Sequence, residues 1–285
     1  MKVAYEGGVN VFDNAEIYAN GDSEILMERA VNRGIKEKFW SRSDLVITTK
    51  LFFGYNSSIS AGGEKLNSVG LSRKHVLEGA AASLDRMGLE YVDIVSVIDT
   101  GKAFYWATSE WPVERIFEAC EVAEKLNMVK PIADQCEHSL IVRDKVDRDY
   151  EPVFEKYRYG TMIWSPLASG VLTGKYLNGN VPDGSRFSME DMHWLKQFYF
   201  SENSLSAVQK MKPIAERLGC TLEQLSLAFS YVKQNVTSIV LGATSVKQLK
   251  ENLEVVEISK RLTPAIMDEI ESVWNNKPKL GRTES

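Results

Sequence analysis

Two stretches decide how this sequence folds: VFDNAEIY at residues 11–18 and LVITTK at residues 45–50. Each contains a short apolar run rich in Val, Ile or Phe, which is typical of a strand buried on both faces. The first run ends at Asp13 and the second ends at Lys50. Because active sites of parallel barrels are built at the carboxyl ends of the strands, we expect this acid and this base to face one site, with Tyr18 close enough to join them.

An aspartate, a lysine and a tyrosine placed together form a proton donor. A phenol has a reference pKa of about 10 and is a weak acid at neutral pH. A nearby ammonium favours the phenolate and makes the proton easier to release. We therefore predict that Asp13 holds Lys50 charged and that Tyr18 is a general acid for a carbonyl oxygen. The alternative is a buried ion pair beside a structural tyrosine, and the strand-end placement favours the catalytic interpretation.

Strands and helices alternate along the whole sequence, without a break in composition. Helical spacing of apolar residues follows most of the expected strands, and His75 falls in the first turn of one such helix, where we expect a solvated residue. The alternation predicts an α/β protein with one domain over residues 1–285. The strands are expected at residues 9–13, 45–50, 91–97, 103–108, 132–135, 161–165 and 238–241.

The composition narrows the classes of function. The 285 residues carry a net charge of −5, with 44% hydrophobic and 26% charged residues, as in an ordinary globular protein. The negative charge argues against nucleic acid as a partner. The three cysteines are scattered and indicate neither a metal site nor a disulfide framework. Since no stretch is long enough to span a bilayer and no signal peptide is visible, we expect a cytoplasmic protein without membrane insertion.

Longer motifs carry a resemblance to a known family: FDNAEIY at residues 12–18, GLSRKH at 70–75, WSPLA at 164–168 and LGA at 241–243. With these motifs the chain resembles the aldo-keto reductases, most closely the branch that contains the β-subunits of voltage-gated potassium channels. The resemblance extends over nearly the whole chain. It implies a (β/α)8 TIM barrel and NADPH-dependent reduction of aldehydes or ketones.

The resemblance also assigns cofactor-binding residues. No Gly-x-Gly-x-x-Gly follows a strand, so a Rossmann dinucleotide fold has no support. By resemblance, Ser109 and Gln135 would bind the nicotinamide amide, and Trp164 would pack beside the ring. Lys175 and Arg186 supply positive charge for a 2′-phosphate, which favours NADPH over NADH. The set implied for the phosphates and the adenosine is Ser165, Pro166, Leu167, Ala168, Gly170, Lys175, Arg186, Gly242, Thr244, Gln248, Glu251 and Asn252.

Two features predict that the barrel is incomplete. The resemblance places a first strand before Met1, which this sequence lacks. Only residues 98–102 separate the expected strands at 91–97 and 103–108, whereas parallel neighbours need a crossover of a dozen or more residues. The strand expected at 91–97 corresponds to the fourth strand of the complete family barrel. The family carries a carbonyl-orienting His or Asn at the end of that strand. Here that position holds Ile98 or is lost with the crossover, so three of four catalytic residues remain.

Three functions stay open on this sequence. The first is an aldo-keto reductase of a small carbonyl substrate, impaired by the loss of the fourth catalytic residue. The second is a cofactor-holding regulatory protein with little turnover, partnered by a channel subunit or by copies of itself. The third is a truncated product that folds poorly. An incomplete copy explains both gaps, and an authentic degenerate relative is the alternative origin.

Overall fold

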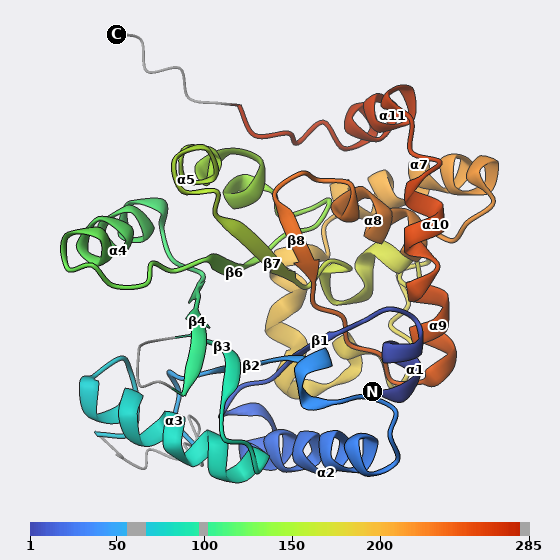
Figure 1. The fold of residues 1–285 in the computed structure, drawn as a ribbon. Coiled ribbons are helices and arrows are strands. Elements are labelled where there is room, and N and C mark those ends of the chain that lie inside the picture. Colours follow the sequence, from blue (N-terminus) through green and yellow to red (C-terminus); the bar gives the residue numbers. More distant parts are fainter. Residues whose placement is uncertain (56–66, 97–101, 280–285) are drawn as a thin grey trace, which may run out of the picture. The chain divides into compact units, whose positions relative to one another are not determined.

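The computed structural model describes residues 1–55, 67–96 and 102–279. The chain divides into two units, Met1–Ala133 and Asp134–Ser285. Strands and helices alternate in each of them (Figure 1). The α/β class predicted from the sequence is therefore confirmed.

The first unit is built on a parallel sheet whose strands lie in chain order. In the register, Asp13 lies opposite Thr48, and Lys50 lies opposite Ser96. The carboxyl ends of these strands consequently share one edge of the sheet. The strands are β1 (Val11–Asp13), β2 (Val46–Lys50), β3 (Val92–Ser96) and β4 (Ala103–Trp106).

Helices of the first unit follow the strands and cover an apolar core. Two of them, α2 and α3, pack against each other (Figure 1). Helix α3 begins where Ser72 accepts a hydrogen bond from the His75 amide at 3.1 Å, which is the cap that Ser72 predicts. The core includes Val31, Ile47 and Met87. The elements are α1 (Lys2–Glu6), η1 (Tyr18–Gly21), α2 (Asp22–Lys36), η2 (Arg42–Asp44), α3 (Arg73–Met87), β5 (Thr108–Ser109) and α4 (Val113–Lys125).

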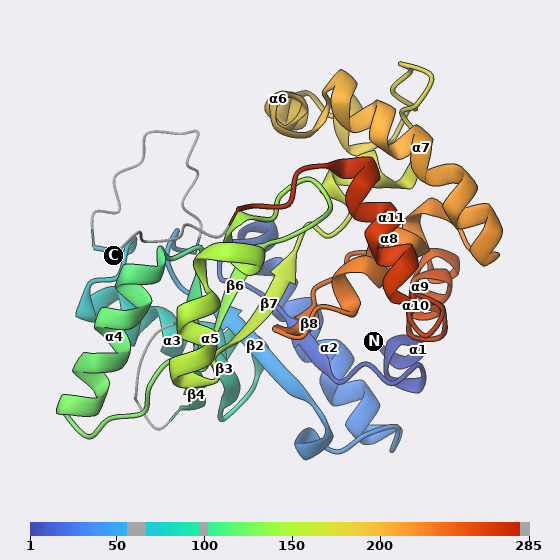
Figure 2. The ribbon, with the colours of Figure 1, turned by 90° about the horizontal axis from the view of Figure 1, so that it is seen from above.

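In the second unit the strand order is β6 (Ala133–Glu137), β7 (Gly160–Trp164) and β8 (Val236–Ile239). Strands β7 and β8 are parallel. Figure 2 shows α7, α8, α10 and α11 lying together at one side of this unit, where they pack on one another. No helix in the described part of the chain is both long and apolar enough to cross a bilayer. The helices are α5 (Glu151–Tyr157), α6 (Lys196–Tyr199), α7 (Glu202–Leu218), α8 (Leu222–Tyr231), α9 (Val246–Leu253), α10 (Val255–Ser259) and α11 (Pro264–Trp274).

Every expected strand is present, although several begin or end one or two residues from the expected positions. The strand expected at residues 103–108 is divided into β4 and β5, and the last strand begins at Val236, two residues before the expected start. The end of the strand expected at 91–97 and Ile98 lie outside the described residues. Since strand order alone does not close a barrel, the incomplete (β/α)8 barrel and the single domain stay predictions.

The pairing of β3 with β4 is unusual for so short a link. The two strands are parallel, with Val92 opposite Ala103, although only residues 97–102 join them. A link of this length reaches about 20 Å, which suffices to return along a five-residue strand of about 17 Å. It leaves no room for the helix that usually covers such a pair. The predicted lack of a crossover helix therefore does not prevent parallel pairing.

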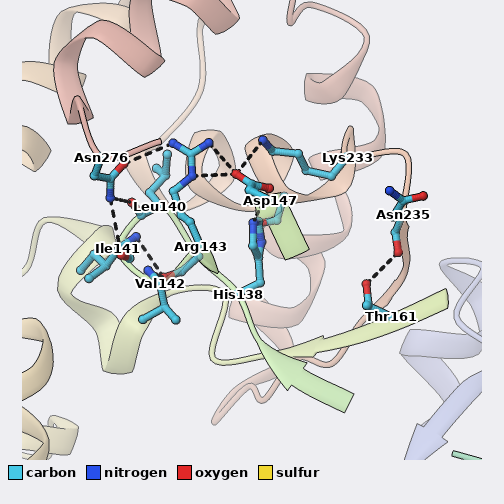
Figure 3. A network of polar contacts seen from close by, with 12 residues as sticks. His138, Leu140, Ile141, Val142, Arg143, Asp147, Thr161, Lys233, Asn235 and Asn276 are labelled. Carbon is cyan, nitrogen blue, oxygen red and sulfur yellow. Dashed lines mark hydrogen bonds and ion pairs between the residues drawn. The ribbon is translucent and has the colours of Figure 1, made fainter. Parts of the chain in front are cut away.

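A buried network of charges lies in the second unit (Figure 3). The Arg143 side chain is 1% exposed, and its guanidinium donates to Asp147 Oδ2 at 2.5 Å and to Glu271 Oε2 at 2.6 Å. Lys233 Nζ lies 3.1 Å from Asp147 Oδ2. His138 Nε2 lies 3.4 Å from Asp147 Oδ1, and its imidazole is fully buried. Arg143 and Asp147 are four residues apart, but the sequence gives no signal that His138, Lys233 and Glu271 join them.

Burial and charge shift the titration of this network in opposite ways. Burial alone would raise the pKa of Asp147, but the contact with His138 and the positive charges of Lys233 and Arg143 hold that pKa far below its usual value. Burial lowers the pKa of His138 more than the neighbouring Asp147 raises it. His138 is therefore a neutral, structural histidine at neutral pH.

We expect the free energy of unfolding to fall on acidification in two ranges. In the unfolded chain, His138 binds a proton below its ordinary pKa of about 6.5. In the folded chain its lowered pKa keeps the imidazole neutral, so the free energy of unfolding decreases from about pH 7 to pH 5. Asp147 contributes a second decrease below about pH 4, its ordinary range. Urea unfolding across this pH series measures both. His138→Gln should flatten the first range, and equal slopes for both proteins from pH 7 to 5 would contradict the assignment.

Candidate functional site

The ends of β1 and β2 bring the three predicted catalytic residues together. Lys50 Nζ lies 2.5 Å from Asp13 Oδ2, 2.8 Å from the Asn14 carbonyl oxygen and 3.3 Å from the Tyr18 hydroxyl. Thr48 Oγ1 donates to the other oxygen of Asp13 at 2.6 Å. The contact follows from the fold, because Asp13 and Lys50 end neighbouring parallel strands and the chain turns into η1 at Tyr18.

Exposure differs sharply within this trio. The side chains of Asp13 and Lys50 are 7% and 16% exposed, whereas Tyr18 is 44% exposed. An ion pair shielded in this way is screened less by salt and water than a surface pair. The phenol is thus presented to small molecules while its charged neighbours are held in place.

A buried carboxylate supports the loop that follows β2. Glu16 Oε1 accepts hydrogen bonds from the amides of Phe52 at 2.7 Å and Gly54 at 2.8 Å, and Oε2 lies 3.3 Å from His75 Nε2. His75 is 3% exposed, so the expectation of a solvated residue is wrong. Gly79 leaves room for this pair, since a Cβ there would lie 3.2 Å from Glu16 Oε2 and 3.3 Å from His75 Nε2.

The loop after β7, which carries several predicted phosphate-binding residues, has an unusual backbone. Ser165, Ala168 and Ser169 have φ values of 55°, 47° and 54°, in the left-handed region that non-glycine residues rarely adopt. Gly170 continues the run at 92°, and a Cβ there would meet Lys175 Nζ at 2.5 Å. Strain of this kind in residues other than glycine is typical of functional sites.

The residues predicted to bind adenosine lie in and just before α9. Gln248 Oε1 accepts hydrogen bonds from the amide of Thr244 at 3.0 Å and from its hydroxyl at 2.8 Å. The Glu251 carbonyl accepts from Gln224 Nε2 at 3.0 Å. Asn252 is 2% exposed, and its Oδ1 has no hydrogen-bond partner among the described residues. A buried acceptor without a partner is rare in proteins and fits a ligand that donates to it.

The other predicted cofactor residues are distributed over both units. Ser109 ends β5 in the first unit, and Gln135 lies buried in β6 of the second. Trp164 is the last residue of β7 and is partly buried. Of the remainder, Pro166 is buried and Leu167 partly buried, whereas Lys175, Arg186 and Gly242 are exposed. Their roles in binding stay predictions.

The chain belongs to the aldo/keto reductase family, whose model matches residues 1–97 and 96–275. Among its relatives is a "Probable voltage-gated potassium channel subunit beta" of Oryza sativa subsp. japonica, 42% identical over 304 residues that cover 100% of this chain and 88% of the relative. A protein of the same name from Arabidopsis thaliana is 43% identical over 298 residues, covering 98% and 87%. The resemblance drawn from the sequence motifs is confirmed.

The family match is interrupted at the end of β3. The family model matches the chain in two segments: the first ends at residue 97 and the second begins at residue 96. The alignment with the rice relative spans 304 positions against the 285 residues of this chain, so at least 19 positions have no counterpart here. The interruption falls where the sequence predicts that the crossover helix is lost.

Proposed function

We propose that this protein reduces aldehydes or ketones with NADPH, as an incomplete (β/α)8 barrel of residues 1–285. The observation that carries the proposal is the contact of Lys50 with both Asp13 and Tyr18, at 2.5 Å and 3.3 Å. An exposed phenol beside a shielded ion pair is suited to general acid catalysis. Membership of the aldo/keto reductase family supports the same chemistry.

Each member of the trio has a distinct part in the proposed reaction. NADPH, when bound, supplies the hydride for the carbonyl carbon. Tyr18 donates its proton to the carbonyl oxygen, and the positive charge of Lys50 stabilises the phenolate that remains. Asp13 keeps Lys50 charged and directed at the hydroxyl, so Asp13 and Lys50 are positioning residues. The family's carbonyl-orienting His or Asn has no clear counterpart after Ser96, and we therefore expect slow turnover.

Residues of the second unit fit a dinucleotide with a 2′-phosphate. The strained loop that contains Ala168 to Gly170 is the expected place of the pyrophosphate, and Lys175 and Arg186 carry the charge that a phosphate monoester requires. The unpartnered Oδ1 of Asn252 is an acceptor for the amino group of adenine. NADPH is therefore the cofactor that we propose.

Titration with NADPH and NADH, followed by nucleotide fluorescence, tests the cofactor. We expect saturable binding of both and tighter binding of NADPH, because the cationic side chains of Lys175 and Arg186 pair with the 2′-phosphate. Replacing both by Met should remove the preference and leave the affinity for NADH nearly unchanged. Failure of the wild-type protein to bind either nucleotide would reject the proposal.

Asn252→Leu should weaken NADPH about tenfold, the typical value of one buried hydrogen bond to a ligand. The variant should keep its affinity for reduced nicotinamide mononucleotide, which has no adenine. Equal weakening of both nucleotides would show that Asn252 acts on the fold and not on adenine.

The names of the relatives and the interrupted family match favour a second candidate: a cytoplasmic, cofactor-holding regulatory subunit with little turnover. Its partner would be a potassium channel subunit, and its own copies could associate. The two candidates differ in one observation. The enzyme consumes bound NADPH when an aldehyde is added, whereas the regulatory subunit holds NADPH without consuming it.

A further inference from the structure

The first unit contains an apolar pocket of about 480 Å³ that plays no part in the proposed reaction. One wall is β4, through Phe104, Tyr105 and Trp106, and the other is α4, through Ala119 and Val122. Its volume lies in the range of about 300–1,000 Å³ that is usual for binding sites. The pocket is thus large enough to bind a substantial apolar group.

Large side chains of this pocket are exposed. Phe104 is 58% exposed, Tyr105 51%, Val122 47% and Met128 45%. Exposed apolar side chains that gather in one place indicate an interaction surface, whereas single ones need no explanation. Nothing in residues 1–55, 67–96 and 102–133 of this unit covers them.

The α4 wall is one face of a helix. Arg115, Glu118, Ala119 and Val122 line the pocket at the spacing i, i+3, i+4 and i+7. Arg115 Nη1 and Glu118 Oε2 lie 2.6 Å apart, so the two charges compensate each other. The surface therefore favours a partner with an apolar stripe and no particular net charge.

The fold explains why this surface is uncovered. Strands β3 and β4 are parallel neighbours, and such a pair is ordinarily covered by the crossover helix that joins them. Here the link has only six residues, and the family match is interrupted at this link. The 19 or more positions without a counterpart are enough for a helix and its connections.

We propose that the pocket is the vacant place of the crossover helix and that it binds an amphipathic helix from a partner chain. The partner helix presents aliphatic side chains at i, i+3, i+4 and i+7 to Phe104, Tyr105 and Val122, with its polar face toward solvent. This is recognition of a helix in a groove, in which a few apolar anchors carry the affinity.

A labelled synthetic helix tests the proposal on the full chain. The probe is a fluorescein-labelled peptide of about 15 residues, four turns, with Leu in the stripe and Glu and Lys elsewhere. A peptide of the same composition in scrambled order is the control. We expect a saturable rise in anisotropy for the amphipathic peptide and none for the scrambled one.

Two variants locate the binding surface. Val122→Asp places a charge in the pocket at a residue already 47% exposed and should weaken the peptide at least about tenfold. Leu26→Asp, at a residue of α2 that is 60% exposed and outside the pocket, should leave the affinity unchanged. The proposal would be overturned if the wild-type protein and both variants bound the peptide with equal affinity, or if the scrambled peptide bound equally well. Self-association of the chain through Val122 in place of peptide binding would also overturn it.

Discussion

Tyr18→Phe should lower the rate of reduction of a reactive aldehyde by about 100-fold or more, the usual contribution of a general acid. The substitution removes one oxygen from a ring that is 44% exposed, so the fold and the affinity for NADPH should not change. The expected loss arises because Tyr18 is the proposed proton donor, with its hydroxyl 3.3 Å from Lys50 Nζ. Steady-state turnover of para-nitrobenzaldehyde with saturating NADPH measures it.

Tyr231→Phe is the matched control, since Tyr231 is exposed to the same 44% and lies in the second unit. Its turnover should equal that of the wild-type protein. Lys50→Met should lower the rate and shift the pH profile, because the ammonium that stabilises the phenolate is removed. Unchanged turnover in Tyr18→Phe would exclude this residue as the acid.

Arg143→Leu should lower the free energy of unfolding by about 3 kcal/mol or more, because removing one partner of a buried ion pair leaves the others unpaired. The guanidinium donates to both Asp147 and Glu271 from a side chain that is 1% exposed. Lys233 compensates only part of the loss, through its contact with Asp147 at 3.1 Å. Urea unfolding followed by circular dichroism measures the difference.

Arg33→Leu provides the comparison for this second prediction. Arg33 pairs with Glu37 at 2.7 Å, but its side chain is 77% exposed, and exposed pairs contribute little. Its unfolding midpoint should stay close to that of the wild-type protein. A similar small effect in Arg143→Leu would mean that the buried network does not stabilise the second unit.

The sequence was informative where a signal was local. Apolar runs that end at Asp13 and Lys50 predicted buried strands, and parallel pairing then required the two ends to share one edge. The proximity of Tyr18 followed from its place five residues after Asp13. The predictive power came from the strand ends, whose position depends on short-range patterns alone.

Contacts between distant residues could not be read in the same way. His75 looked like a solvated residue, because nothing in its helix reveals that Glu16, 59 residues away, lies beside it. The network of Arg143, Asp147 and Glu271 likewise joins side chains separated by up to 128 residues. Composition also gave no sign that Ser165, Ala168 and Ser169 adopt left-handed backbone, which these residue types ordinarily avoid.

Single-turnover oxidation of bound NADPH tests the central claim most directly. Protein saturated with NADPH is mixed with excess para-nitrobenzaldehyde, and the nucleotide absorbance and the alcohol formed are followed together. The account predicts loss of one NADPH per alcohol in the wild-type protein and a rate at least about 100-fold lower in Tyr18→Phe. Persistence of bound NADPH in the wild-type protein, or equal rates for both proteins, would contradict it.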